Sequence, residues 1–362
     1  MGSETRFSPK ALILLLAGVA AFLIYIYVFN VDIPKIISEI QRANPYFYLL
    51  AFAASILDVS FFALTWHFLL RPLSIKPSFK KTFLLVWVGL FIDLLIPAEG
   101  VSGEISKAYL MGKDHEDGIG KVVASLVAQR IIGTIITVLM LVLGALTLFV
   151  NHLLTGFVLN LMVLVIAGTV ISLIVLLLFC IKEAWTLRMV DALVRFADYV
   201  TRGRWKLKTL RTEALRATRM FHKGIKTYGA DVKALAPPIV FATASWMFNI
   251  LTYYFVFLSL GFSQISWSVL MVVSALIIAI KAVPLGVPFE VGLPEITMST
   301  LFFYLLVPDL KLCITATILI RILTVLARFF IGFAAQQLLG IQVITTVDTK
   351  KLLEQPSEKE NR

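Results

Sequence analysis

The sequence predicts an all-α polytopic membrane protein, and three observations lead to that class. Of the 362 residues, 59% are hydrophobic and only 15% are charged, whereas a soluble domain is nearer half apolar and a quarter charged. The mean hydropathy is +0.91. The apolar residues also form runs that approach the roughly 20 residues a helix needs to cross a bilayer. This composition excludes a soluble enzyme, a disordered tail and a disulfide-stapled secreted domain.

Eight apolar segments are the candidate membrane helices. In chain order they are residues 11–29, 46–70, 82–97, 119–150, 153–181, 235–261, 267–284 and 310–339. The third and the seventh are short, and each runs into a stretch dense in Pro and Gly, residues that end helices. A further apolar stretch follows each break, at 105–111 and at 296–307. Each break therefore predicts a re-entrant hairpin rather than a full span.

Basic residues set the expected orientation, because an excess of Lys and Arg marks the cytoplasmic side. The loop 182–234 holds thirteen basic and five acidic residues, and the loop 71–81 and the amino terminus are also basic. If all eight segments crossed the membrane, the loop 182–234 would lie outside. If the third and seventh segments enter and return as hairpins, every basic loop is cytoplasmic. We therefore expect six full spans plus two re-entrant hairpins in the cell membrane, with both termini cytoplasmic.

A shift of 191 positions superposes the two breaks without a gap. The matched residues are Pro97 with Pro288, Glu99 with Glu290, Glu104 with Glu295, and Arg130 with Arg321. A charged residue within a spanning helix is rare, so an arginine matched to an arginine favours a true repeat. In the preferred topology the two units run in opposite directions. The sequence thus predicts an inverted repeat of helix, re-entrant hairpin and helix, an architecture that many transporters use.

The expected organisation is a single integral membrane domain over residues 1–340. Repeat 1 covers about 45–150 and repeat 2 about 235–340, with a basic amphipathic insert at 182–234 between them and a polar tail at 341–362. The first segment lacks the small-residue cleavage site of a signal peptide, so we expect it to be retained as a helix.

The hairpin breaks predict a shared cavity. Irregular backbone at membrane depth is tolerated only where it is buried in protein or lines a water-filled space. The break residues are Pro97, Gly100, Gly103, Pro288, Gly292 and Pro294. An inert bundle with proline kinks is the alternative, but kinks alone do not account for acids beside each break.

Two arginines lie near the middle of the membrane. Arg130 is about 12 residues, or about 18 Å, into its segment, and Arg321 is about as deep. An arginine there costs on the order of 2.5–3.5 kcal/mol, so it should face the protein interior and a partner. The planar guanidinium suits a phosphate clamp. Equally, each could form a structural ion pair, Arg130 with Glu104 and Arg321 with Glu295. Arg328 lies nearer the inner face, and we expect it to extend toward the interface.

Acidic residues accompany the arginines. Glu99, Glu104, Glu290 and Glu295 lie at or beside the breaks, where they could exchange protons or hold a cationic headgroup. Helix capping is the alternative for Glu104 and Glu295, because an acid is favourable at a helix amino terminus. Asp58, about 13 residues into the second segment, is a candidate third partner for the arginines.

The run from Ile96 to Ala108, with Gln129-Arg130 further on, resembles the first motif of the lysylphosphatidylglycerol synthase transmembrane (flippase-like) family. The run from Pro288 to Glu295, followed by Ile320-Arg321-Ile322, resembles its second motif. The common pattern is a Pro, a Gly-rich turn, a Glu and a later Arg on a helix. The resemblance covers roughly residues 10–340.

The resemblance implies an integral membrane protein. In the best-understood relatives the corresponding domain moves an anionic or aminoacylated phospholipid between leaflets. This sequence differs from the family pattern at Glu290, where a Gly is common, and at Ser106-Lys107, where an Arg is frequent. About 22 residues follow Gly340, so we expect no aminoacyl-transferase domain and no lysyl transfer.

The expected function is a lipid flippase-like transporter that moves an anionic or phosphate-bearing lipid between leaflets. Arg130 and Arg321 would hold the phosphate, and the glutamates would gate or couple the movement. Two alternatives stay open: a proton- or ion-coupled transporter of a small polar solute, and a non-transporting scaffold for a lipid-modifying enzyme. We expect no enzyme, cofactor or metal site, since no nucleophile–base pair, P-loop or GxGxxG occurs. The acidic stretch 114–117 carries a single His, so we expect a solvated turn there and not a metal site.

The expected partners are membrane lipids. Apolar residues recur at helical spacing in 182–234 and predict two amphipathic helices. Their basic faces suit anionic lipid headgroups, although topology-setting charge with a packing cap explains them as well. A nucleic-acid partner is not expected, and the sequence is compatible with an oligomer.

Overall fold

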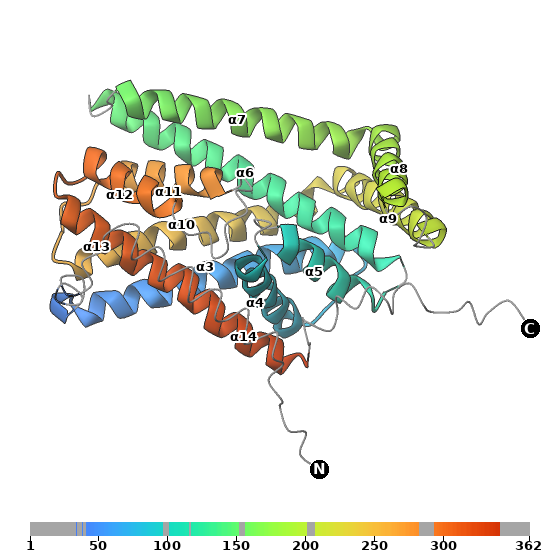
Figure 1. The fold of residues 1–362 in the computed structure, drawn as a ribbon, viewed down its shortest axis with the longest axis horizontal. Coiled ribbons are helices and arrows are strands. Elements are labelled where there is room, and N and C mark those ends of the chain that lie inside the picture. The colour runs from blue at the N-terminus through green and yellow to red at the C-terminus, as the bar shows by residue number, and fades with distance from the viewer. Residues whose placement is uncertain are drawn as a thin grey trace, which may run out of the picture.

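The computed structural model describes residues 34, 38, 41–96, 101–115, 117–151, 156–200, 207–281 and 293–340. All of the regular secondary structure in these ranges is helical. Long helices lie side by side in a bundle, and two further helices lie at one end of it (Figure 1). The predicted first segment at 11–29 and the tail at 341–362 fall outside the described residues.

The helices follow the predicted segments closely. Their bounds are α3 Pro45–Leu70, α4 Phe79–Leu95, α5 Val101–Gly112, α6 Gly118–Val150, α7 Gly156–Ile181, α8 Glu183–Val200, α9 Leu207–Ala230, α10 Ala236–Ser259, α11 Trp267–Lys281, α12 Leu293–Leu305, α13 Leu310–Arg321 and α14 Ala327–Leu338.

Among the described residues, five helical stretches are long and apolar enough to cross a membrane. They are Pro45–Leu73, Gly118–Val150, Val158–Ile181, Val232–Ser259 and Leu310–Leu338. These correspond to the second, fourth, fifth, sixth and eighth predicted segments. The third and seventh segments form the shorter helices α4 and α11, of 17 and 15 residues. The prediction of a multi-pass all-helical membrane protein is therefore confirmed.

Several helix starts are fixed by side chains that cap free backbone amides. Asn44 accepts a hydrogen bond from the backbone of Tyr46, with Pro45 at the first helical position of α3. Ser78 caps α4 and Asp309 caps α13 in the same way. Such caps satisfy amides that have no partner within the helix, so α3, α4 and α13 begin where the sequence supplies a cap.

The centre of the bundle is built by helices that are distant in sequence. α3 packs along α10, α4 packs on α14, and α6 packs on α11. Large side chains fill the space between them, including the fully buried Trp66, Trp87, Phe257 and Phe302.

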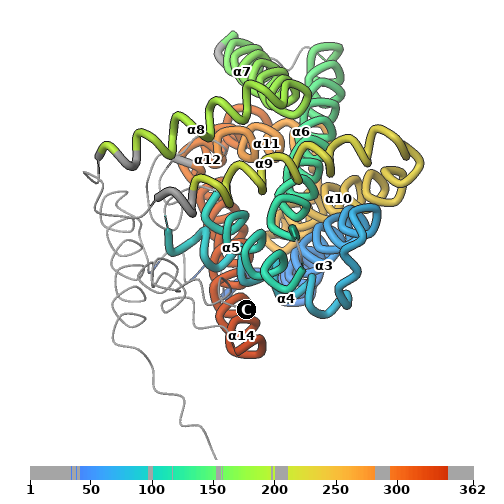
Figure 2. The backbone as a smooth tube through the Cα atoms, turned by 90° about the vertical axis from the view of Figure 1, so that its right-hand side faces the viewer, coloured from blue at the N-terminus to red at the C-terminus, as the bar shows by residue number. Residues whose placement is uncertain are grey.

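The two helices α8 and α9 run across the end of the bundle (Figure 2). They are the amphipathic pair that the sequence predicts between residues 182 and 234. α9 packs on α6, where Arg216 Nε lies 2.6 Å from Asp117 Oδ1. The Tyr228 hydroxyl donates to the carbonyl of Leu69 at 2.5 Å. Burial raises the pKa of Tyr228, so the phenol remains a neutral donor.

The eighth predicted segment differs from expectation in one respect. The sequence predicts a single helix over 310–339, but Ile322–Leu326 forms a π-helical turn between α13 and α14. No Pro or Gly lies in this turn, so composition gave no signal for it. π-turns occur mostly as short insertions in α-helices, frequently at functional sites.

Candidate functional site

The first predicted ion pair joins α5 to α6. Arg130 Nη1 lies 3.3 Å from Glu104 Oε1. Glu104 lies in the first turn of α5, where the helix dipole also favours a carboxylate. The two side chains keep 37% and 32% of their surface exposed. The pair therefore holds the start of α5 to α6 and stays accessible from outside the protein.

Asp93 fixes the start of α5 against α4. Its Oδ1 accepts hydrogen bonds from the Gly103 amide at 2.6 Å and from the Ser102 hydroxyl at 2.8 Å. A Cβ on Gly103 would lie 2.3 Å from the Gly89 carbonyl and 2.4 Å from the Asp93 carboxylate. Only glycine fits this approach, which explains the residue at this predicted break. The role of Asp93 was not evident from the sequence.

A buried lysine stands beside the first pair. Lys107 is only 6% exposed, and its ammonium lies 5.4 Å from the Trp66 ring centroid and 5.6 Å from that of Phe62. Glu104 and Asp93 supply the nearby negative charge. Sequence reasoning named Lys107 only as a departure from a family pattern. Its spacing, three residues or one helical turn after Glu104, was the available signal.

The second predicted ion pair joins α12 to α13. Arg321 Nε contacts Glu295 Oε1, and the side chains are only 10% and 6% exposed. Glu295 lies in the first turn of α12, as Glu104 does in α5. Arg321 is the last residue of α13 and directly precedes the π-turn. The predicted pairing is thus present in both halves, and the second pair is buried.

Asp58 belongs to a separate polar cluster between α3 and α10. Its carboxylate accepts from the Ser245 hydroxyl at 2.6 Å and from the Asn249 amide at 3.3 Å. The Ser274 hydroxyl of α11 donates to Asn249 Oδ1 at 2.8 Å. Asp58 was expected to partner Arg130 or Arg321, but the arginine beside it is Arg328.

A small pocket opens at this cluster. Its lining residues are Ser55, Asp58, Val59, Trp87, Asn249, Thr252, Leu323, Thr324 and Arg328. The free space is on the scale of one water molecule. Within the described part of the chain, the buried Trp87 Nε1 has no hydrogen-bond partner. Arg328 lines the pocket together with Asp58, and its extension toward the membrane interface stays a prediction.

Among the other residues predicted at or beside the breaks, Pro294 lies within the described ranges. Pro294 is buried in the first turn of α12. The remaining predicted residues lie outside the described ranges, and they are Pro97, Glu99, Gly100, Pro288, Glu290 and Gly292. The meeting of four carboxylates in one cavity stays a prediction.

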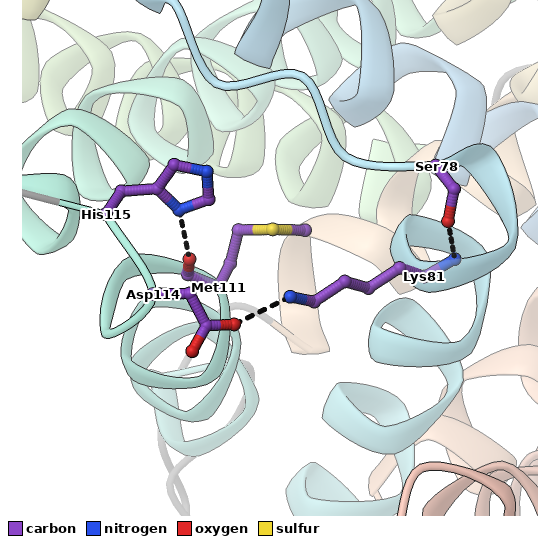
Figure 3. Close-up of polar contacts among 5 residues, drawn as sticks. All are labelled: Ser78, Lys81, Met111, Asp114 and His115. Carbon is purple, nitrogen blue, oxygen red and sulfur yellow. Dashed lines mark hydrogen bonds and ion pairs between the residues drawn. The ribbon is translucent and has the colours of Figure 1, made fainter.

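The turn between α5 and α6 is tied to the start of α4 (Figure 3). Lys81 Nζ lies 2.8 Å from Asp114 Oδ2, and His115 Nδ1 lies 3.1 Å from the Met111 carbonyl. The hydrogen bond from Lys81 lowers the pKa of Asp114. Among the residues that the structure describes, no cluster of three or more His, Cys, Asp or Glu side chains could hold a metal ion.

The sequence matches the model of a known protein family. Residues 13–332 match the model of the lysylphosphatidylglycerol synthase TM region. The chain belongs to this family. The matched range contains both Glu–Arg pairs and the Asp58 cluster, so these features lie inside the family domain.

Relatives within the lysylphosphatidylglycerol synthase TM family are described as UPF0104 membrane proteins. The one from Pyrococcus horikoshii is 26% identical over 322 residues, 87% of this chain and 93% of the relative. The one from Methanothermobacter thermautotrophicus is 22% identical over 341 residues, 92% and 97% of the two chains. A Methanocaldococcus jannaschii relative is 33% identical over 106 residues, 29% and 32% of the two chains. No solved structure matches.

Proposed function

We propose that this protein is a transporter that moves an anionic or phosphate-bearing lipid between the leaflets of the cell membrane and is not an enzyme. The observation that carries the proposal is the pair of Glu–Arg contacts. Each joins the first turn of one helix to an arginine 26 residues later in the next. One contact is accessible and the other is buried. Unequal exposure of two equivalent pairs supports alternating access, in which one inverted repeat moves against the other.

An inverted repeat accounts for the arrangement of the helices. α3 and α10 begin 191 residues apart, and α5 and α12, like α6 and α13, begin within one residue of that offset. α4 packs on α14 while α11 packs on α6, which are the corresponding helices of the other unit. Asp58 and Asn249 are also 191 positions apart and share a hydrogen bond. Equivalent residues that touch each other are expected beside a two-fold axis between repeats.

The short helices support re-entrant hairpins. α4 has 17 residues and is about 25 Å long, shorter than the roughly 30 Å hydrocarbon core. α4 packs on α5, and α11 packs on α12. The proposed topology also requires the turn after α5 and the insert 182–234 to lie on one side of the membrane. The contact between Asp117 and Arg216 supports this requirement, and the excess of basic residues makes that side cytoplasmic.

The chemistry of the pairs suits a lipid phosphate. A phosphate oxygen can replace the Glu104 carboxylate on the guanidinium of Arg130, because both acceptors fit the same planar fork. The accessible part of Arg130 indicates a polar opening, since a lipid-facing arginine at that depth would cost on the order of 2.5–3.5 kcal/mol. Lys107 adds a second cation near the pair. At the buried pair, the π-turn after Arg321 offers a place for the helix to rearrange.

Leaflet exchange in reconstituted vesicles tests the proposal. A headgroup-labelled phosphatidylglycerol and a labelled phosphatidylcholine would be compared by the fraction of label that a membrane-impermeant reductant quenches. Arg130→Gln and Arg321→Gln should each slow exchange of the anionic lipid at least about tenfold, the loss of one charge-assisted contact. Arg219→Gln, at an exposed position on α9, is the matched control and should retain exchange.

Full exchange in both arginine variants would refute the phosphate role. A flux of small polar solute that follows the proton gradient without lipid dependence would favour the coupled-transporter alternative. Absence of any flux, with a lipid-modifying enzyme retained on the purified protein, would favour the scaffold alternative.

Proton coupling is a second candidate function because of the Asp58 cluster. A carboxylate between two neutral donors and the nearby Arg328 can gain or lose a proton as its surroundings change. If Asp58 carries the coupling proton, Asp58→Asn should abolish the dependence of flux on an imposed proton gradient. Unchanged gradient dependence in Asp58→Asn would remove this candidate.

A further inference from the structure

We propose that α8 is a membrane-surface helix whose exposed apolar face lies in the headgroup region of an anionic leaflet. The proposal does not depend on whether the protein moves lipid. α8 carries large apolar side chains that no described part of the chain covers. These exposed residues are Trp185, Met189, Leu193, Phe196 and Tyr199.

The exposed residues form one stripe. At about 100° per residue, Trp185, Met189 and Phe196 fall within about 40° of each other on the helix surface. Leu187, Val190 and Val194 lie on the opposite side, where they are partly buried, and α8 packs against α9. The packing of α8 against α9 therefore does not use the apolar stripe.

The position of α8 places this stripe at the membrane edge. α7 is a candidate span with little of its surface buried inside the protein, and its last residue, Ile181, is exposed. Glu183 begins α8 two residues later. The Thr186 hydroxyl donates to the Phe179 carbonyl at 2.8 Å and fixes the joint. α8 then runs across the end of the bundle (Figure 2), so the apolar surface of α7 continues onto a helix that lies across the spans.

The basic residues at the edge of the apolar stripe favour an anionic surface. Arg188 and Arg195 are exposed along one edge of the apolar stripe. α8 also carries Glu183, Asp191 and Asp198. Glu183 is engaged with Lys226 of α9 at 3.4 Å. Asp191 is engaged with Arg195 at 2.6 Å and with Arg211 of α9 at 2.5 Å. These contacts lower the pKa of Asp191, mainly through the hydrogen bond from Arg211. A stripe of large apolar residues with basic residues at its edge is the pattern of an interfacial helix.

Depth measurement with a nitroxide label tests the proposal. Cys180 and Cys313 are free, so both would first be replaced by Ala. Single cysteines at Leu193, at Arg188 and at Val190 would then carry the label in the full chain. Vesicles of phosphatidylcholine would be compared with an equal mixture of phosphatidylcholine and phosphatidylglycerol. Collision rates with oxygen, which partitions into lipid, and with a water-soluble nickel chelate report the depth.

In the mixed vesicles the Leu193→Cys label should collide several-fold more with oxygen than with the chelate, at a depth of about 5–10 Å. The Arg188→Cys label should favour the chelate, and the Val190→Cys label should be shielded from both reagents. Replacing Arg188 and Arg195 by Gln should shift the Leu193→Cys label toward the chelate in the mixed vesicles. Equal access of the chelate to Leu193→Cys and Arg188→Cys would overturn the proposal. Shielding of Leu193→Cys from both reagents would also overturn it, because protein would then cover the stripe.

Discussion

The two Glu–Arg pairs share chemistry and spacing but differ in surroundings. Glu104 and Arg130 keep about a third of their side chains exposed, whereas Glu295 and Arg321 are almost fully buried. The helix that carries Arg130 continues without interruption, while the helix that carries Arg321 changes to a π-turn at the next residue. Two pairs with the same residue types and the same spacing of 26 positions therefore differ in exposure.

The two Glu–Arg pairs also differ in the contacts that hold the short helices α5 and α12 in place. α5 is fixed by the Asp93 carboxylate and by the close approach that Gly103 allows. The residue 191 positions after Gly103 is Pro294, which has no amide hydrogen to donate. At α12 the buried pair of Glu295 with Arg321 makes the corresponding attachment. Among the described contacts, α5 is thus held by close backbone packing as well as by its ion pair, and α12 is held by its buried ion pair.

The largest expected effect is on folding stability. Arg321→Gln should reduce the free energy of unfolding by about 3–5 kcal/mol, because the buried Glu295 carboxylate would lose the guanidinium that offsets its charge. Arg130→Gln should cost less than about 1 kcal/mol, since water can solvate the exposed part of Glu104. Unfolding by denaturant in detergent micelles measures both.

A control separates the lost charge pair from lost packing. The double variant Glu295→Gln with Arg321→Gln removes both charges of this pair and should recover part of the loss. Equal destabilisation by Arg130→Gln and Arg321→Gln would erase the contrast between the two halves.

The next largest effect concerns the close contact between α4 and α5 at Gly103. Gly103→Ala should destabilise the protein by about 1–3 kcal/mol, because the new methyl group overlaps the Gly89 carbonyl and the Asp93 carboxylate. Gly133→Ala is the matched control on α6, where an added Cβ meets nothing within 4 Å. That change should be neutral or slightly stabilising, since alanine favours helix. If the two substitutions had the same effect, the close packing of α4 and α5 would not be what holds α5.

The sequence predicts the bundle well because membrane helices obey a local rule. A run of apolar residues must be helical in lipid, so the limits of α3, α6 and α10 follow from composition. The two ion pairs were also predictable, because an arginine at membrane depth requires a partner. The partners of Asp58 and the burial of Lys107 depend on which helices meet. The π-turn at Ile322–Leu326 contains no Pro or Gly that would mark it. Local sequence patterns therefore carry none of these three features.

Thiol labelling measures the difference in exposure directly. In a background with Cys180 and Cys313 replaced by Ala, Glu104→Cys should react with a water-soluble maleimide about fivefold faster than Glu295→Cys. The rate follows the accessible fraction of the thiol, and the exposed fractions of the two carboxylates are 32% and 6%. Complete labelling of both variants after denaturation is the control. A substrate lipid that drives alternation should bring the two rates closer together. Equal rates without lipid would mean that both sites occupy the same state.

The smallest effect lies at the turn that follows the first pair. The hydrogen bond from Lys81 lowers the pKa of Asp114 below its ordinary value of 3.8 in the folded protein. A carboxyl with a depressed folded pKa stabilises the fold above its unfolded pKa, and the contribution is lost as the pH falls through the folded pKa. Solvent screens this exposed pair, so Asp114→Asn should cost less than about 1 kcal/mol at pH 7. The difference between wild type and Asp114→Asn should disappear on acidification below that folded pKa, as followed by thermal unfolding. A difference that persisted there would mean that Asp114 acts through packing instead of charge. The Lys81–Asp114 contact would then not make the attachment of α4 to the α5–α6 turn sensitive to pH.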